Sequence, residues 1–264
     1  MDRARRRRFG QNFLDDSTAK LIADDLPVNN QAILEIGPGH GAMTKHLLKK
    51  NVPLTAVEID DQCATLLKDR FAEDSNFSIV NVDFLKFDLL QWLEEHPLSW
   101  ITGNLPYNVS TAIIAGLMPR LSKTSGFMGM VQLEVAERLC AVPCTKAYGS
   151  LSVWVRSYGE PRLLRKIGPE HFTPKPNVDS ATIMIVPREN PIKASEGFFE
   201  WVQLAFSMKR KRIANSLSTS YEKELVFKAL SILNLSENTR AEELSPEQFL
   251  DLYQLLLKLK SQTN

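Results

Sequence analysis

The sequence predicts a doubly wound α/β protein whose last strand is antiparallel, followed by a small all-helical domain. Short apolar runs alternate with helical stretches from residue 32 to about residue 187, as in a parallel sheet with crossover helices. The last two runs are joined by a segment too short and too rich in proline for such a crossover. Beyond residue 190 the apolar residues follow a helical period, and no further strand is indicated.

Five runs are expected to form the parallel strands, in chain order. They are "AILEIG" (32 to 37), "PLTAVEID" (53 to 60), "FSIVNVD" (77 to 83), "SWITGN" (99 to 104) and "GFMGMVQ" (126 to 132). "LSVWVRSYG" (151 to 159) and "DSATIMIVP" (179 to 187) come last, and we expect them to close the sheet as an antiparallel pair.

A change in composition near residue 190 predicts a domain over residues 1–188 and a second over residues 189–264. "EGFFEWVQLAF" and "SPEQFLDLYQLLLKLK" have helical periodicity without strands. Ser245 and Gln248 have the spacing of a capping box and mark the start of the last helix.

Composition places this chain among globular, soluble proteins. The chain has 264 residues, of which 44% are hydrophobic and 24% are charged. No window approaches the roughly 18 apolar residues of a membrane span, and the arginine-rich start lacks the apolar segment of a secretory signal. We therefore expect a cytoplasmic protein. The three cysteines have neither a disulfide nor a zinc-site spacing, so no metal is expected.

The positive charge is clustered although the net charge is only +1. Residues 3 to 8 read "RARRRR" and residues 209 to 212 read "KRKR". Such clusters favour a polyanionic partner, because each Lys or Arg that meets a phosphate releases counterions. Solvated surface runs are the plain alternative. The candidate phosphate contacts are Arg5, Arg6, Arg7, Arg8, Arg210, Lys211 and Arg212.

A glycine-rich turn, "EIGPGHGA" (35 to 42), lies where the first strand should lead into a helix. Gly37 and Gly39 allow the main chain to approach a ligand, and they also satisfy the loose dinucleotide-binding pattern. Glu35 favours S-adenosylmethionine, because a carboxylate would repel a pyrophosphate but tolerates a sulfonium and an ammonium.

Acidic residues also follow the next two strands. Glu58 is placed to accept from ribose hydroxyls and Asp83 from an adenine amino group, because ligands of open α/β sheets bind at these strand ends. Each acid could instead cap a helix, which is the better interpretation for Asp60 and Asp61.

The fourth strand ends at "NLPY", residues 104 to 107. The Asn104 side-chain oxygen and the carbonyl of Leu105 or Pro106 could accept from the two N–H bonds of an adenine amine, and Tyr107 could stack on the base. Pro106 restricts the backbone and so helps to aim that carbonyl. A simple turn has the same composition. The target base would have to leave its helix or come from a single strand.

Six motifs, in order along the chain, resemble the small-subunit (16S-type) rRNA adenine N6,N6-dimethyltransferase family. They are "RRFGQNFL" (7 to 14), "EIGPGHGAMT" (35 to 44), "GNLPYNVST" (103 to 111), "KAYGSLSV" (146 to 153), "FTPKPNVDSA" (172 to 181) and "RKRIANSL" (210 to 217).

The resemblance implies a Rossmann-like class I methyltransferase that dimethylates two adjacent adenines of rRNA in the 30S subunit or its precursor. It implies cofactor binding by Asn12, Leu14, Gly37, Glu58, Asp83 and Asn104, and a role for Phe172 in sandwiching the adenine against Tyr107. Without the resemblance, Phe172 would be assigned to hydrophobic closure of the last two strands. We expect a monomer.

Three other functions fit the same motifs less well. The large-subunit rRNA adenine methyltransferases share the "NLPY" arrangement, whereas "FTPKPNVDS" and "RKRIANSL" favour the small-subunit group. A non-catalytic ribosome-assembly or RNA-binding factor would not need intact "NLPY" and acidic positions. A DNA adenine methyltransferase is disfavoured because no target-recognition domain is indicated.

Overall fold

The computed structural model describes residues 12–192, 195, 197–208 and 211–263. Contacts divide the chain into two compact units. The first comprises Met1–Ala136 and Gly159–Arg188, and the second comprises Glu137–Tyr158 and Glu189–Asn264. The division at residue 188 coincides with the expected domain boundary. Residues 137–158, expected in the first domain, group instead with the C-terminal helices.

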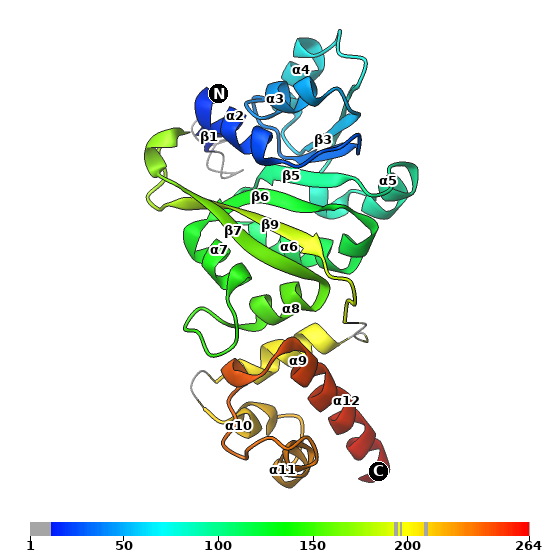
Figure 1. Ribbon diagram of the computed structural model, residues 1–264, viewed down its shortest axis with the longest axis vertical. Helices are drawn as coiled ribbons and strands as arrows, with labels where there is room; N and C mark the ends of the chain where they lie inside the picture. The colour runs from blue at the N-terminus through cyan, green and yellow to red at the C-terminus, as the bar shows by residue number, and fades with distance from the viewer. Residues whose placement is uncertain (1–11, 193–194, 196, 209–210, 264) are drawn as a thin grey trace. The chain divides into compact units, whose positions relative to one another are not determined.

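A seven-stranded sheet forms the centre of the first unit, in the order β4-β3-β2-β5-β6-β9-β7 (Figure 1). Its strands are β2 (Ile33–Ile36), β3 (Leu54–Glu58), β4 (Phe77–Asn81), β5 (Trp100–Asn104), β6 (Gly126–Gln132), β7 (Gly159–Ile167) and β9 (Ser180–Pro187). The first five strands of this order are parallel, and β9 is antiparallel to both its neighbours. The predicted doubly wound sheet with an antiparallel last strand is confirmed.

The strand order reverses between β2 and β5, which places the ends of these strands at the centre of one sheet edge. Connections leave β2 for β3 on one side and β5 for β6 on the other, so a crevice opens outside their carboxyl ends. Every residue of β2 and β3 is buried, as expected for strands covered on both faces.

Helices cover both faces of the sheet. The helices of this unit are α2 (Asp16–Asp25), α3 (Thr44–Leu47), α4 (Asp61–Arg70), α5 (Leu89–Glu95) and α6 (Ser110–Leu117), with α7 (Leu133–Cys140) at the division between the units. Ile22, Leu47 and Leu67, from α2, α3 and α4, pack in one core with Ile33 and Leu54 of the sheet. On the opposite face Trp92 of α5 donates to the Thr55 hydroxyl of β3 over 3.1 Å.

The predicted strand at residues 151 to 159 is wrong. Residues 151–158 lie in helix α8 (Ser150–Tyr158), and the outer antiparallel partner of β9 is β7, which was expected to be a loop. Burial overrides the strand preference of Val153 and Val155, because both pack fully inside the protein on a helix. β7 was missed because a bulge between Leu163 and Arg165 breaks its alternation, and Pro161 is tolerated at a sheet edge.

The second unit is helical around an aromatic core. Besides α8 it contains α9 (Phe198–Ala205), α10 (Ile213–Leu217), α11 (Lys223–Ile232) and α12 (Pro246–Thr263). Phe198, Trp201 and Phe249 belong to one buried cluster. The predicted capping box begins α12, since Ser245 N–H donates to Gln248 Oε1 and Gln248 N–H to Ser245 Oγ. Among the described residues, no helix is both long and apolar enough to cross a membrane.

Candidate active site

A cavity of about 320 Å³ lies at the carboxyl ends of β2, β3 and β5, where the strand order reverses. Besides Glu35, ten of the residues singled out in the sequence line it. They are Asn12, Leu14, Gly37, Gly39, Glu58, Asp83, Asn104, Leu105, Pro106 and Tyr107. Segments from five places in the chain therefore meet at the predicted edge of the sheet.

The glycine turn after β2 has a backbone that only glycine adopts easily. Gly37, Gly39 and Gly41 have φ values of +64°, +57° and +78°. The Gly39 N–H donates to Glu58 Oε2 over 2.9 Å, which ties the turn to the end of β3. A Cβ on Gly39 would lie 3.0 Å from the ring of Phe13, so the turn also makes room for this aromatic side chain.

Two carboxylates are buried in the cavity wall. Burial raises the pKa of Glu35 from 4.5 to about 7; the hydrogen bond from Thr44 Oγ1 opposes this rise and the neighbouring Glu58 adds to it. Burial also raises the pKa of Glu58, although the N–H groups of Asp60 and Gly39 donate to its carboxylate. Among the described residues, no Lys, Arg or His forms an ion pair with either acid, and two buried acids in this state favour a cationic ligand.

Asp83 follows β4 by two residues and lines the cavity. Its Oδ1 accepts from the Leu85 N–H over 3.0 Å, so it also caps the short helix Phe84–Lys86. The capping and ligand-binding interpretations are compatible, because a carboxylate has four lone-pair sites and this contact occupies one. Asp60 caps α4 as expected, accepting from the N–H groups of Gln62 and Cys63.

Asn104 ends β5 in the middle of this edge. Its Nδ2 donates to the main-chain carbonyl of Asn12 over 2.9 Å, which leaves Oδ1 as the acceptor of the amide. The preceding Gly103 lets the strands approach closely, because a Cβ there would lie 2.4 Å from the Ile36 carbonyl oxygen. This requirement explains the glycine in "GNLPY".

The two main-chain carbonyls proposed for the target amine differ in their surroundings. The Pro106 carbonyl accepts from the N–H groups of Val109 and Ser110 at the start of α6. No bond to the Leu105 carbonyl is found among the described residues, while the Leu105 N–H is held by Met130 O over 3.0 Å. The geometry therefore favours Leu105 over Pro106 as the second acceptor.

Tyr107 and Phe172 lie in different surroundings. Tyr107 lines the cavity, and its hydroxyl lies 2.6 Å from Ser180 Oγ. Burial raises the pKa of this phenol. Phe172 is 4% exposed and packs in the core with Leu14 and Met130, outside the cavity lining. Phe172 pairs with Leu14 across a two-stranded ladder, and its role in sandwiching an adenine against Tyr107 stays a prediction.

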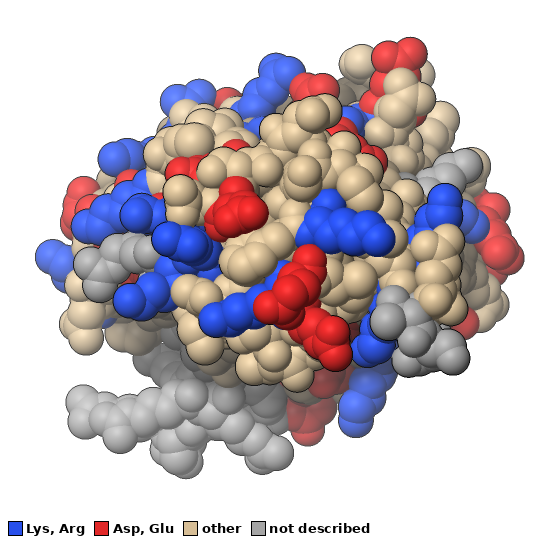
Figure 2. Space-filling model, turned by 90° about the horizontal axis from the view of Figure 1, so that it is seen from below, with Lys and Arg blue, Asp and Glu red and all other residues tan. Residues whose placement is uncertain are grey.

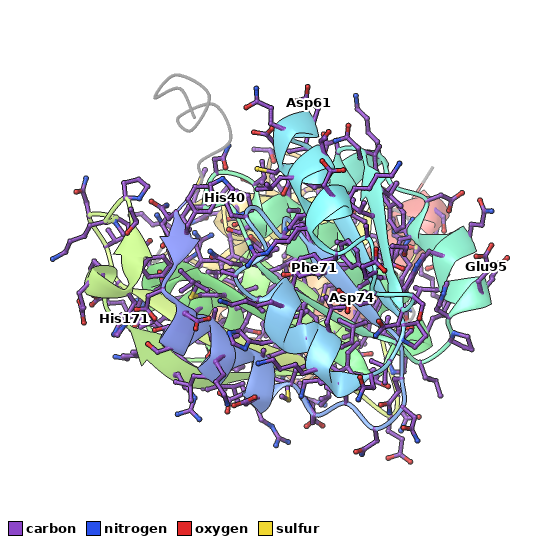
Figure 3. The ribbon with its side chains drawn as sticks, turned by 90° about the horizontal axis from the view of Figure 1, so that it is seen from above. His40, Asp61, Phe71, Asp74, Glu95 and His171 are labelled. Atoms are coloured by element: carbon purple, nitrogen blue, oxygen red, sulfur yellow. The ribbon has the colours of Figure 1, made fainter. Side chains whose placement is uncertain are left out.

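Sequence reasoning missed Phe13 and His40. Phe13 lines the cavity, and its ring stacks on that of His40 with centroids 4.0 Å apart and planes 10° apart. Figure 3 labels His40. Phe13 lies inside the motif "RRFGQNFL" (7 to 14), but nothing in the sequence around it indicated a stacking partner 27 residues further along the chain.

The basic residues predicted to contact phosphate can be placed only in part. Arg5, Arg6, Arg7, Arg8 and Arg210 lie outside the described residues. Lys211 and Arg212 are exposed at the start of α10 in the second unit. Figure 2 shows Lys and Arg side chains interspersed with Asp and Glu on the face that it views. In the described part of the chain, no three His, Cys, Asp or Glu residues are grouped to hold a metal ion.

The family model for ribosomal RNA adenine dimethylases matches residues 2–258. Ribosomal RNA small subunit methyltransferase A of Clostridium botulinum is 36% identical over 247 residues, covering 91% of this chain and 90% of that protein. The protein of the same name from Lactococcus lactis is 36% identical over 268 residues, covering 97% and 91%.

Two solved structures share the fold. A dimethyladenosine transferase from Plasmodium falciparum superposes with a TM-score of 0.79 at 21% identity, covering 95% of this chain and 98% of that one. The 23S rRNA methyltransferase ErmE superposes with a TM-score of 0.67 at 27% identity, covering 93% and 99%.

Proposed function

The chain belongs to the ribosomal RNA adenine dimethylase family, and from this premise we propose that it transfers methyl groups from S-adenosylmethionine to N6 of two adjacent adenines near the 3′ end of small-subunit rRNA. The observation that carries the proposal is the Asn104 amide at the strand-order reversal. Its Nδ2 is committed to the Asn12 carbonyl, so Oδ1 is left to accept.

The cavity fits the cofactor by charge. S-adenosylmethionine carries a sulfonium and an ammonium, and the buried Glu35 and Glu58 provide the opposite charge. Gly37 and Gly39 would let the main chain approach it, with Asn12, Leu14 and Asp83 forming further walls. The bound cofactor supplies an electrophilic methyl group on sulfur.

An adenine amine is a weak nucleophile because its lone pair is delocalised into the ring. Asn104 Oδ1 and the Leu105 carbonyl would accept from its two N–H bonds, which moves the nitrogen toward tetrahedral geometry and localises the lone pair. Tyr107 would offer its ring face to the flipped-out base. No strong base is needed, since the methylated ammonium is acidic enough to release its proton to water. Catalysis is then positioning and electrostatics.

Asn104→Ala tests this assignment. Loss of one aligned acceptor should reduce turnover by ~10²-fold, measured by mass spectrometry of rRNA after incubation of unmodified small subunits with S-adenosylmethionine. Asn76→Ala is the control, because Asn76 Nδ2 also donates to a main-chain carbonyl, that of Val52, but at the amino end of β4. If a folded Asn104→Ala variant keeps the original rate, the mechanism is wrong.

The similarity to ErmE keeps a large-subunit rRNA adenine methyltransferase as the second candidate. The names of the relatives at 36% identity favour the small subunit. Mapping the modified nucleotide in rRNA from cells with and without the protein separates the two. A non-catalytic assembly factor would instead bind S-adenosylmethionine without methylating small subunits.

The partner is proposed to be rRNA within the 30S subunit or its precursor, in the cytoplasm. Phosphate contacts are assigned to Arg5, Arg6, Arg7, Arg8, Arg210, Lys211 and Arg212 on electrostatic grounds. A monomer that works without a metal ion stays a prediction, which sedimentation and activity in the presence of a chelator would test.

A further inference from the structure

The main-chain group that orients Asn104 lies directly before a two-residue strand. Strand β1 (Phe13–Leu14) pairs antiparallel with β8 (Phe172–Thr173), with Leu14 opposite Phe172. Asn12, directly before β1, accepts from Asn104 Nδ2 through its carbonyl. A ladder this short has few hydrogen bonds of its own, so other contacts must hold the segment in place.

Asp15 and His171 extend the ladder with side chains. The Asp15 N–H donates to the His171 carbonyl over 2.9 Å, and His171 Nδ1 lies 2.8 Å from Asp15 Oδ2. The other carboxylate oxygen, Oδ1, accepts from the Thr18 N–H and caps α2. One carboxylate thus joins the start of α2 to the segment that leads into β8. Figure 3 shows His171 on that segment.

The hydrogen bond between Asp15 and His171 has a defined direction. Partial burial acts to raise the pKa of Asp15, but hydrogen bonds from the Thr18 N–H, Ser17 and His171 outweigh it and hold the pKa well below its ordinary value. Because an ionised carboxylate only accepts, His171 Nδ1 must be the donor. Thr18 Oγ1 and Glu170 Oε1 are the other polar groups near this ring, at 3.0 Å from Nδ1 and 3.7 Å from Nε2.

The consequence for the active site follows from the chemistry of an amide. A flipped Asn104 would place Oδ1 against the Asn12 carbonyl, so two acceptors would face each other 2.9 Å apart. It would also present N–H donors to the target amine, which needs an acceptor. The Asn12 carbonyl therefore selects the productive orientation, provided that β1 stays on β8.

We propose that Asp15 and His171 form a clasp that holds β1 on β8 and thereby positions the Asn104 side chain for methyl transfer. This inference rests on the proposed function. Both are positioning residues that act through the Asn12 carbonyl and touch no reacting atom.

The test compares four single variants and one double variant with the unsubstituted full-length protein, using unmodified small subunits and saturating S-adenosylmethionine. His171→Ala removes the donor to Asp15. His171→Asn keeps an N–H near the position of Nδ1. Asp16→Ala is the matched control, because Asp16 is the neighbouring acid at the start of the same helix and pairs with a different histidine, His46, over 2.7 Å. Asn104→Ala provides the background for a double variant.

His171→Ala should lower kcat ~10-fold while KM for the small subunit changes less than about twofold. A misplaced Asn104 side chain slows methyl transfer but does not alter the surface that binds the subunit. His171→Asn should restore most of kcat, and Asp16→Ala should keep it within about twofold. On the Asn104→Ala background, His171→Ala should cause no further loss, as expected for residues acting through one group. Thermal midpoints are measured for every variant.

Wild-type kcat in His171→Ala would overturn the clasp, as would equal losses in His171→Ala and Asp16→Ala. A stable His171→Asn variant that does not regain activity would overturn it too. Failure of the proposed function is seen separately, as absence of methylation by the unsubstituted protein or full activity of Asn104→Ala.

Discussion

Glu35 offers the sharpest energetic prediction in the molecule. Its side chain is 1% exposed, and Thr44 Oγ1 donates to it over 2.8 Å. We predict that Glu35→Gln becomes more stable relative to the unsubstituted protein as pH rises. Glutamine is neutral at every pH and keeps an oxygen that can accept from Thr44, so the substitution removes the ionisation and little else.

The size of the effect follows from the pKa. Burial raises the pKa of Glu35 from 4.5 to about 7, with Glu58 adding to the rise. One pKa unit corresponds to about 1.4 kcal/mol, so burying this carboxylate in its ionised form costs about 3 kcal/mol.

The sign is set by proton binding. The folded chain keeps a proton that the unfolded chain loses between pH 4.5 and about 7, so the free energy of unfolding falls as pH rises through this window. About 2.5 kcal/mol of this loss in the free energy of unfolding occurs between pH 5 and pH 8. Glu35→Gln escapes this loss.

Urea unfolding of the cofactor-free proteins at pH 5 and pH 8 measures the effect. The difference in unfolding free energy between Glu35→Gln and the unsubstituted protein should shift by about 2.5 kcal/mol in favour of the variant. Glu95→Gln on α5 is the control, because Glu95 is exposed (Figure 3). An equal difference at both pH values for Glu35→Gln would refute the reasoning.

Three further predictions follow from the same edge of the sheet and from the basic cluster. A cation bound beside Glu35 should displace its proton, so S-adenosylmethionine affinity should rise from about pH 5.5 to 7.5, with proton release in calorimetry; affinity independent of pH would contradict this. Gly103→Ala places a Cβ 2.4 Å from the Ile36 carbonyl oxygen. We expect it to lower the free energy of unfolding by ~1–3 kcal/mol. Gly116→Ala, on α6 with nothing within 4 Å of the added Cβ, should raise that free energy by ~0.5–1 kcal/mol; urea unfolding compares the two, and equal effects would argue against a close approach at Gly103. Lys211→Ala should weaken binding to small-subunit rRNA, with cofactor affinity unchanged. The slope of the logarithm of the RNA-binding constant against the logarithm of the salt concentration should fall by ~1 in magnitude. Filter binding across salt concentrations measures this slope, and an unaltered slope would show that Lys211 does not contact the RNA.

The strands that carry the site were predictable because their signals are local. β6 was predicted with its observed bounds, and Glu58 and Asp83 lie at the expected edge. Apolar runs of strand length reveal a buried sheet whatever their partners are. Parallel strands share a direction, so residues at their carboxyl ends must meet.

The segment at residues 151 to 159 was not predictable in this way. Val153 and Val155 favour a strand by propensity, yet both are buried on α8. Propensity is a small energetic preference, and the burial of these side chains exceeds it. The neighbouring β7 was hidden by its bulge and its exposed charges.

By itself the sequence determined that Gly37, Glu58, Asp83 and Asn104 gather at the cavity, since periodicity and spacing place strand ends without reference to distant partners. Only the tertiary structure decided how those residues are used. It directs Asn104 Nδ2 to a carbonyl 92 positions away, engages the Pro106 carbonyl with α6, and buries Phe172 against Leu14. Hydrogen-bond partners and burial depend on neighbours in space, and no local pattern encodes them.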